Sequence, residues 1–250
     1  MPHFAANLTM LFAELPLLER FAAAQHAGFD AVEVLFPYDH DPKELRAALD
    51  DCGLPLILFN TPPGDWQNGE RGFAAVPGAE GRFNEGLALA LEYAEILRPA
   101  FIHVMSGNAA GPKALDTLLG NLHRAVQHSP RQGFLIEPLN PYDMPGYFLN
   151  DFATASHVIA DINAANLGLQ FDAYHAHRIT GDLLGTWNAF RHQAQHIQIA
   201  DHPGRHEPGS GEIPFAAFFE HLKSSAYTGW ISAEYHPANT TVSSLGWLKP

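Results

Sequence analysis

The feature that most constrains the fold is an alternation that repeats along the whole 250-residue chain, in which short apolar runs are followed by longer segments with helical periodicity. Most of the short runs are continuously apolar, which is typical of parallel strands covered by helices. We expect strands at residues 3–8, 31–36, 55–60, 100–105, 133–138, 167–172, 196–201 and 229–234. Eight strand–helix units in about 250 residues predict an α/β fold, a (β/α)8 TIM barrel.

We expect a single TIM-barrel domain over residues 1–250, because no shift in composition marks a linker. An open doubly wound sheet is the alternative, but such a sheet usually has fewer units or a nucleotide-binding motif. No GxGxxG follows the first expected strand, and no phosphate-binding loop is present. Residues 61–80 are too rich in glycine and proline for regular structure. They predict a long loop at the mouth of the barrel, and long loops of this kind are usually functional.

Several segments between the expected strands have apolar residues at helical spacing and the end markers of helices. In the first of them, Pro16 stands near the start and Gly28 near the end. Asp116 and Asp151 are predicted to cap two later helices at their amino ends. The expected helices are residues 16–29, 42–53, 82–97, 114–127, 151–163 and 215–226.

The charge balance and cysteine content restrict the partners and the compartment. Lysine and arginine number 14 and aspartate and glutamate 27, so the formal net charge is −13, which repels phosphate backbones and argues against nucleic acid. The single cysteine, Cys52, excludes an internal disulfide and favours a cytoplasmic location. No apolar run reaches the roughly 18 residues of a membrane span, and no signal peptide is expected at the amino terminus. We therefore expect no membrane partner, and a homo-oligomer is left open.

Polar residues stand on four successive expected strands, near the carboxyl ends where TIM barrels carry their chemistry. Glu137, Asp172 and Glu234 lie at the ends of the fifth, sixth and eighth strands, and Gln198 interrupts the apolar run of the seventh. Each lies about one strand–helix unit from the next, so the four side chains can converge. Three carboxylates and an amide oxygen at one point predict a cation, and hard oxygen ligands suit Mg²⁺ or Mn²⁺. The alternative is that each is a separate strand-end cap or salt-bridge partner.

Other polar residues near the strands are candidates for the pocket. His175 follows the sixth strand and is expected to orient or polarise a substrate oxygen, with an exposed loop histidine as the alternative. His103, on the fourth strand, points either into the mouth or into a core layer. Glu33 lies in mid-strand, where a structural carboxylate with a local partner and a catalytic one are both open. Asn7 and Asn60 end strands and are weaker candidates for hydrogen bonds.

Segments that run in order along nearly the whole chain resemble the hydroxypyruvate isomerase family. This family belongs to the xylose-isomerase-like barrels, and its close sister group isomerises 2-oxo-tetronates. The most specific segment is PGRHEPGSGEI, which is followed by a strand that ends in Glu-Tyr. The resemblance is carried by FAANLTMLF, GFDAVEVLFPYD, LFNTPPGDW, HVMSG, LIEPLNP, LQFDAYHAH, HIQIADHPGRHEPGSGEI and GWISAEYHPANTTVSSLGWL.

The resemblance implies a divalent metal, held at four strand ends, and a proton that two glutamates exchange with the substrate. The implied ligands are Glu137, Asp172, Gln198 and Glu234, and the implied proton-transferring residues are Glu137 and Glu234. Gln198 stands where the sugar epimerases of the superfamily have histidine, and an amide is a weaker ligand than imidazole. The resemblance also implies that His175 and Arg205 contact the substrate.

Arg205 is expected to bind a substrate carboxylate. The implied substrate is an anion, whereas the chain carries a charge of −13 and the site three carboxylates. A guanidinium in the turn DHPGRHEP could meet a carboxylate with two parallel hydrogen bonds. The alternative is an exposed arginine paired with Glu207. We include Glu207 and His103 among the substrate-binding candidates.

The sequence therefore predicts an aldose–ketose-type isomerase, an intramolecular oxidoreductase that acts on a small anionic hydroxy-oxo acid. Hydroxypyruvate would become tartronate semialdehyde through a metal-stabilised enediolate, in glyoxylate and carbohydrate-acid metabolism. A 2-oxo-tetronate isomerase is the first alternative, and LIEPLN followed by GYFL leans toward the hydroxypyruvate group. A sugar epimerase would favour histidine in place of Gln198. A DNA-repair endonuclease would need more metal-binding histidines and a basic groove, and a non-catalytic sugar-acid-binding barrel would lack one of the two glutamates.

Overall fold

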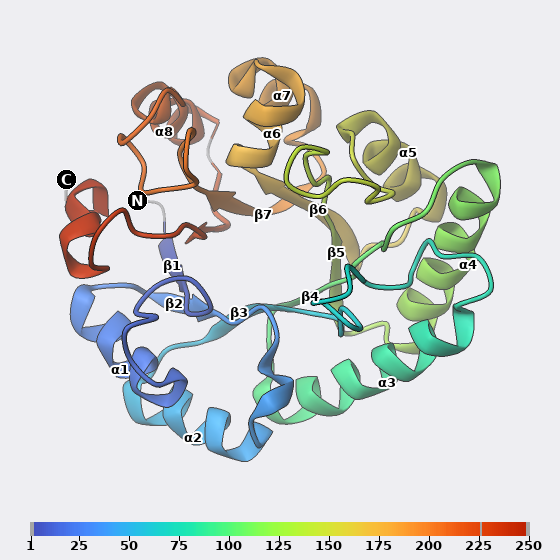
Figure 1. Cartoon of the computed structure of the whole chain (residues 1–250), viewed down its shortest axis with the longest axis horizontal. Coiled ribbons are helices and arrows are strands. Elements are labelled where there is room, and N and C mark those ends of the chain that lie inside the picture. Colours follow the sequence, from blue (N-terminus) through green and yellow to red (C-terminus); the bar gives the residue numbers. More distant parts are fainter. Residues whose placement is uncertain (1–2, 226, 249–250) are drawn as a thin grey trace.

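The computed structural model describes residues 3–225 and 227–248, and within them eight parallel strands close into a barrel. The strands follow one another around the barrel in sequence order, and β1 pairs with β8 to close it (Figure 1). This closed barrel confirms the predicted (β/α)8 fold. The strands are β1 (His3–Asn7), β2 (Ala31–Glu33), β3 (Leu56–Asn60), β4 (Phe101–His103), β5 (Gly133–Ile136), β6 (Leu167–Asp172), β7 (Ala194–Ile199) and β8 (Trp230–Ala233).

Helices form an outer ring around the strands (Figure 1). The α-helices are α1 (Leu17–Ala27), α2 (Pro42–Cys52), α3 (Glu80–Leu97), α4 (Pro112–His128), α5 (Phe152–Ile162), α6 (Ala173–Thr180), α7 (Leu183–Phe190) and α8 (Phe215–Ser224), and the short 3-10 helices are η1 (Pro37–Asp39) and η2 (Val242–Leu248). All six predicted helices are present, although the last residue expected in the final one, Ala226, lies outside the described residues. Helices α6 and α7 lie in a segment for which no helix was predicted.

The helix ends follow local chemistry in most cases. Gly28 ends α1 in the left-handed conformation with φ +95°, which a residue without Cβ adopts readily. Asp151 caps α5 as predicted, since its carboxylate accepts from the backbone N–H of Thr154 at 2.7 Å. The predicted cap at Asp116 is wrong, because α4 already begins at Pro112 and Asp116 lies inside the helix. Proline at the first helical position starts that helix one turn earlier than the aspartate would.

The segment between β3 and α3 has neither a regular helix nor a strand, as its glycine and proline content predicts. It is nevertheless packed in place. Ala74 is fully buried, and its carbonyl accepts from the Asn121 side chain at 2.9 Å. Gly72 forms a bridge to Ser106, and a Cβ at Gly72 would lie 2.4 Å from the Cβ of Met105. This close approach requires glycine and holds the loop against the chain that follows β4.

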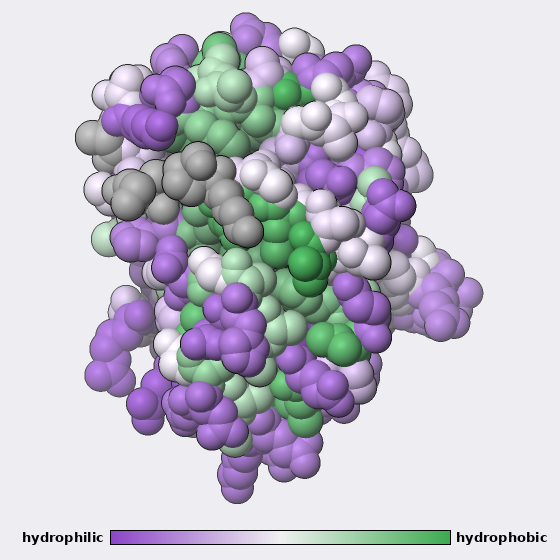
Figure 2. All heavy atoms as spheres, turned by 90° about the vertical axis from the view of Figure 1, so that its left-hand side faces the viewer, coloured by the Kyte–Doolittle hydropathy of each residue, from purple (hydrophilic) through white to green (hydrophobic). Residues whose placement is uncertain are grey.

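The first strand, β1, and the last described helix, η2, lie on the same side of the barrel (Figure 1). Figure 2 shows that this face carries a patch of hydrophobic residues within a largely hydrophilic surface. The apolar residues Phe12, Leu15, Val242 and Leu245 line a hollow between α1 and η2. Among the described residues, no helix is both long and apolar enough to cross a bilayer.

Candidate active site

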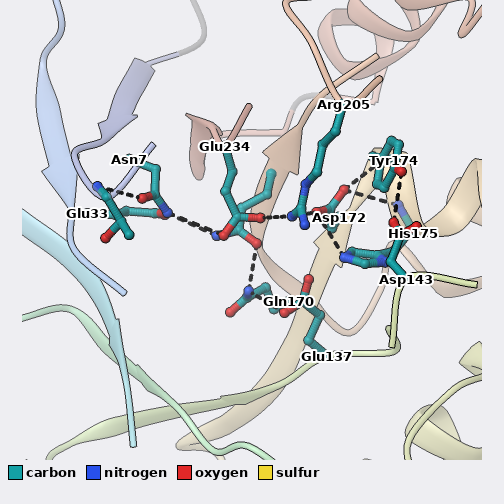
Figure 3. Close-up of polar contacts among 12 residues, drawn as sticks. Asn7, Glu33, Glu137, Asp143, Gln170, Asp172, Tyr174, His175, Arg205 and Glu234 are labelled. Atoms are coloured by element: carbon teal, nitrogen blue, oxygen red, sulfur yellow. Dashed lines mark hydrogen bonds and ion pairs between the residues drawn. The ribbon is translucent and has the colours of Figure 1, made fainter. Parts of the chain in front are cut away.

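Three carboxylates meet at the carboxyl ends of the barrel strands (Figure 3). Asp172 is the last residue of β6, and Glu137 and Glu234 directly follow β5 and β8. Their exposed fractions are 4% or 5% for the glutamates and 0% for Asp172. We call these three residues the carboxylate cluster. Parallel strands in a barrel bring their carboxyl ends to one edge, and this is why residues far apart in the sequence come together here.

Arg205 is the cation that joins the cluster. Its Nη2 lies 3.4 Å from Asp172 Oδ2 and also forms an ion pair with Glu234 (Figure 3). Its Nε is buried without a hydrogen-bond partner among the described residues. Glu207 has another partner, because its carboxylate accepts from the backbone N–H of Ala238 at 3.0 Å. The alternative of an Arg205–Glu207 pair therefore does not describe the structure.

The loop that carries Arg205 is braced around one buried carboxylate. Asp201 is fully buried and accepts backbone N–H groups from Gly209, Gly211 and Ile213 at 2.8–3.0 Å. Arg205 itself has φ +54°, a conformation that costs a residue with a side chain about 1 kcal/mol or more. Hydrogen bonds within the loop and buried ion pairs at the arginine hold it in this conformation.

Burial changes the protonation of the cluster. It raises the pKa of Glu234 to about 8, an effect that the charge of Arg205 opposes and that of Asp172 reinforces. Burial also raises the pKa of Glu137 well above its usual range, and the charges of Glu234 and Asp172 add to this effect. The pKa of Asp172 rises less clearly, because Arg205 and backbone N–H groups stabilise its charged form. Such neighbouring carboxylates titrate as a group and hold protons near neutral pH.

His175 is buried in the first turn of α6, rather than exposed in a loop. Its Nδ1 lies 2.9 Å from the backbone N–H of Asn140 and also 2.9 Å from the side-chain nitrogen of Asn140. Asn140 must direct its NH₂ group there, because its Oδ1 accepts from the backbone of Tyr142 and Asp143. Burial, together with the charge of Arg205, lowers the pKa of His175 well below its usual value. The ring is therefore neutral and carries its proton on Nε2, 3.8 Å from Asp172.

His103 lies at the end of β4, next to Glu137. Its Nδ1 is 3.2 Å from Asn60 Oδ1 and 3.7 Å from Glu137 Oε2. Its Nε2 has no partner among residues 3–225 and 227–248. Burial lowers the pKa of His103 to about 3, so the ring is neutral. Of the two orientations left open by the sequence, the structure has the one that brings His103 to the carboxylate cluster.

Gln198 lies in a second polar group beside the cluster. Its Oε1 accepts from Gln170 Nε2 at 2.6 Å, and its Nε2 donates to Glu33 at 3.0 Å. Gln170 also donates to Glu137 at 2.8 Å (Figure 3). Gln170 was not among the predicted site residues, although it interrupts an apolar strand in the same way as Gln198 does. Asn140 was missed as well, and its position in a loop carried no such signal.

The donor set of the cluster fits an oxygen-preferring divalent cation. Glu137, Asp172 and His175 are buried, and each offers one ligand atom within 4.8 Å of the others. Glu137 Oε1 is buried and has no hydrogen-bond partner among the described residues, so a cation would satisfy it. His175 fits less well than the carboxylates, because metal-binding histidines donate their second ring N–H, whereas Nδ1 here accepts.

Comparison with known proteins supports the resemblance seen in the sequence. The family model described as xylose isomerase-like TIM barrel matches residues 21–250. A 2-oxo-tetronate isomerase from Cupriavidus necator is 47% identical over 100% of this chain and 98% of its own length. The hydroxypyruvate isomerase of Escherichia coli is 40% identical over 100% of this chain and 99% of its own. The crystal structure of an AP endonuclease, family 2, from Brucella melitensis has a TM-score of 0.96 and 41% identity, with 100% and 99% of the two chains covered.

The closed barrel and these matches define the class of protein, and the chain belongs to the xylose isomerase-like TIM barrel family. Within this family it is an isomerase, as are the curated relatives that it matches over nearly their full length.

Proposed function

We propose that this isomerase acts on a small hydroxy-oxo acid, and that it interconverts hydroxypyruvate and tartronate semialdehyde. The observation that carries the proposal is the cluster of three buried carboxylates, two of which pair with one guanidinium. Burial raises the pKa of all three, and most clearly those of Glu137 and Glu234. A carboxyl group with a raised pKa can hold a proton that an ordinary carboxylate has lost, and it can therefore donate as well as accept, as this reaction requires.

The reaction moves hydrogen between neighbouring carbons and conserves all atoms. The carbon that bears the hydroxyl loses a proton to one glutamate, and the second glutamate gives a proton to the former carbonyl carbon. The hydroxyl proton passes to the former carbonyl oxygen. Glu137 and Glu234 are proposed for the two transfers, because they flank the site from β5 and β8. Negative charge builds up on the substrate oxygens in the enediolate between the two transfers.

The neutral rings and Arg205 are proposed to bind the substrate. The Nε2–H of His175 is suited to donate a hydrogen bond to a substrate oxygen. The lowered pKa of His175 keeps the ring neutral near neutral pH, so the ring does not take up a second proton. His103 offers a second unpaired ring nitrogen beside Glu137. The unpartnered Nε of Arg205 supports our proposal that its guanidinium also meets the substrate carboxylate. Glu207 is a weaker candidate, since its carboxylate is held by Ala238.

We further propose that Mg²⁺ or Mn²⁺ is held by Glu137 and Asp172, with Glu234 and Gln198 as the other predicted ligands. When bound, such an ion stabilises negative charge on the two substrate oxygens. Glu234 would exchange its contact with Arg205 to become a ligand, whereas the Oε1 of Gln198 has a second lone pair that could meet the ion while it accepts from Gln170. The single cysteine and the net charge of −13 support a cytoplasmic enzyme without a nucleic-acid partner.

A 2-oxo-tetronate isomerase is the second candidate function. The specific observation in its favour is the relative from Cupriavidus necator, which bears that name and is 47% identical over the full chain. Both reactions move a proton between adjacent carbons of a hydroxy-oxo acid, so the same glutamates and the same arginine would serve a four-carbon substrate.

The test is proton exchange followed by NMR. The purified protein is mixed in D₂O with hydroxypyruvate and, separately, with 2-oxo-tetronates, and the loss of carbon-bound proton signals is recorded. We expect exchange and product formation with one of these acids and the loss of both in the double variant Glu137→Gln/Glu234→Gln. No exchange with either acid, in the presence of Mg²⁺ or Mn²⁺, would refute the proposed function.

A further inference from the structure

Next to the carboxylate cluster, the barrel interior holds a fourth carboxylate that the proposed reaction does not use. Glu33, at the end of β2, is fully buried, and its Oε1 contacts Nε2 of the equally buried His196 on β7. A buried carboxylate is costly unless several donors meet it. Its other oxygen, Oε2, receives two amide N–H donors, one from β1 and one from β7 (Figure 3).

The first connection joins Glu33 to Glu234 through Asn7 on β1. Asn7 Nδ2 donates to Glu33 Oε2 at 3.2 Å and to Glu234 Oε1 at 3.3 Å. At the other end of the amide, Oδ1 accepts from the backbone N–H of Thr9 at 3.1 Å. Each end of the amide thus has its own partner, and the NH₂ group must face the two carboxylates.

The second connection joins Glu33 to Glu137 through two glutamines. Gln198 donates to Glu33 Oε2 and accepts from Gln170, whose Nε2 also donates to Glu137 Oε2. Gln198 meets Glu33 Oε2 with its Nε2, so Glu33 holds this amide with its NH₂ group toward the carboxyl group. The oxygen of Gln198 then faces Gln170, and Gln170 must turn its own NH₂ group toward Glu137.

We propose that Glu33 is a positioning residue for both proton-transferring glutamates, because its carboxylate sets the direction of the amides that hold Glu137 and Glu234. The inference rests on the proposed function, which makes these two glutamates the reacting groups. Glu33 acts through Asn7, Gln198 and Gln170, and no hydrogen bond among the described residues joins it directly to either glutamate. Misplacement of a reacting group by about 1 Å costs on the order of a hundredfold in rate. The effect of Glu33 should therefore appear in kcat more than in KM.

The test compares two substitutions at Glu33. In Glu33→Gln, the amide oxygen still accepts from Asn7 and Gln198, and the new NH₂ group faces Nε2 of His196. In Glu33→Leu, Gln198 loses the acceptor of its NH₂ group, and Asn7 keeps only Glu234 as an acceptor. With hydroxypyruvate or a 2-oxo-tetronate as substrate, we expect kcat to fall by about tenfold to a hundredfold in Glu33→Leu, with a much smaller change in KM, and Glu33→Gln to recover most of the loss. Equal kcat values in the two variants would overturn the proposal.

Ser232→Ala is the matched control. Ser232 lies on β8 in register with Gln198, is fully buried, and has no hydrogen-bond partner among the described residues. Its removal should leave kcat at the wild-type value. If Glu33→Leu does not fold, Asn7→Leu removes the single link of the first connection and Gln170→Leu removes the link next to Glu137 in the second. Both variants leave Glu33 in contact with His196. Each should lower kcat with KM nearly unchanged, and wild-type kcat in both would refute the proposal.

Crystal structures separate this inference from the proposed function, because they need no substrate. In Glu33→Leu or, failing that, Gln170→Leu, at least one of Glu137 and Glu234 should adopt a different side-chain orientation from wild type. Unchanged orientations of both would overturn the positioning role even if the wild-type enzyme isomerises the expected acid. A changed orientation in a protein without isomerase activity would support the positioning geometry and refute the proposed function alone.

Discussion

Replacement of Arg205 by alanine tests the electrostatic design of the site. The side chain is 17% exposed and pairs with two carboxylates that are themselves buried. Its own pKa is lowered by burial, but the charges of Glu234 and Asp172 outweigh that effect and raise it above its usual value. Arg205 is thus charged throughout the accessible pH range, and its loss removes the cation that contacts Asp172 and Glu234.

The size of the effect follows from the bonds that are lost. A hydrogen bond to a charged group contributes about 1.5–3 kcal/mol, so two bonds to a substrate carboxylate correspond to about 3–6 kcal/mol, or roughly 10²–10⁴ in kcat/KM. Loss of one partner from a buried ion pair lowers the free energy of unfolding by about 3–5 kcal/mol. We expect a loss of about 3 kcal/mol, the lower end of this range. Burial raises the pKa of Glu234 to about 8, so Glu234 can take up a proton when the charge of Arg205 is removed.

The assay compares a charged with an uncharged substrate. Arg205→Ala should reduce kcat/KM for hydroxypyruvate by about 10²–10⁴-fold. If dihydroxyacetone is turned over, the fold-loss in its kcat/KM should be smaller by a factor of about ten or more. Arg205→Lys should recover part of the loss, since an ammonium cannot reproduce the planar fork. Arg131→Ala removes an exposed positive charge that precedes β5 at the opposite end of the barrel, and should change neither value. Equal losses on the two substrates would show that Arg205 organises the carboxylates without binding the substrate carboxylate.

Three further predictions concern the cluster. Glu137→Gln and Glu234→Gln should each reduce turnover by about 10²–10⁴, as the loss of a general acid or base does; near-normal proton exchange in both variants would contradict their role. Exhaustive chelation should lower activity, with recovery on addition of Mg²⁺ or Mn²⁺ and no unique preference for Zn²⁺, whereas full activity in a verified metal-free sample would exclude the metal proposal. Between pH 4.5, the ordinary pKa of a glutamate, and about pH 8, Glu234 in the folded, metal-free protein holds a proton that the unfolded chain has released. The free energy of unfolding should therefore fall as pH rises through this window. Chemical denaturation should show a shallower fall in Glu234→Gln, and an identical slope would refute the assignment.

Much of this protein could be predicted from its sequence, because the signals are local or periodic. The alternation of apolar runs and helical segments specified the barrel, and the carboxylates at the ends of the fifth, sixth and eighth strands specified the edge at which chemistry occurs. Parallel strands in a barrel must bring these ends together, so the convergence of Glu137, Asp172 and Glu234 followed from strand order alone. The resemblance to the isomerase family was likewise readable from segments in sequence order, and the comparisons confirm it.

The contacts of individual side chains were decided only by the tertiary structure. Arg205 pairs with Asp172 and Glu234 rather than with nearby Glu207, because the loop held by Asp201 directs it inward. No sequence pattern states which way an amide faces, since its partners lie on other strands.

Gln198, for example, is oriented by Glu33, which lies 165 residues away in the chain. The proton on His175 Nε2 depends in the same way on Asn140, in the loop that follows β5. Periodicity records which face of an element is buried, whereas hydrogen-bond direction depends on donors and acceptors that only the closed barrel brings within reach.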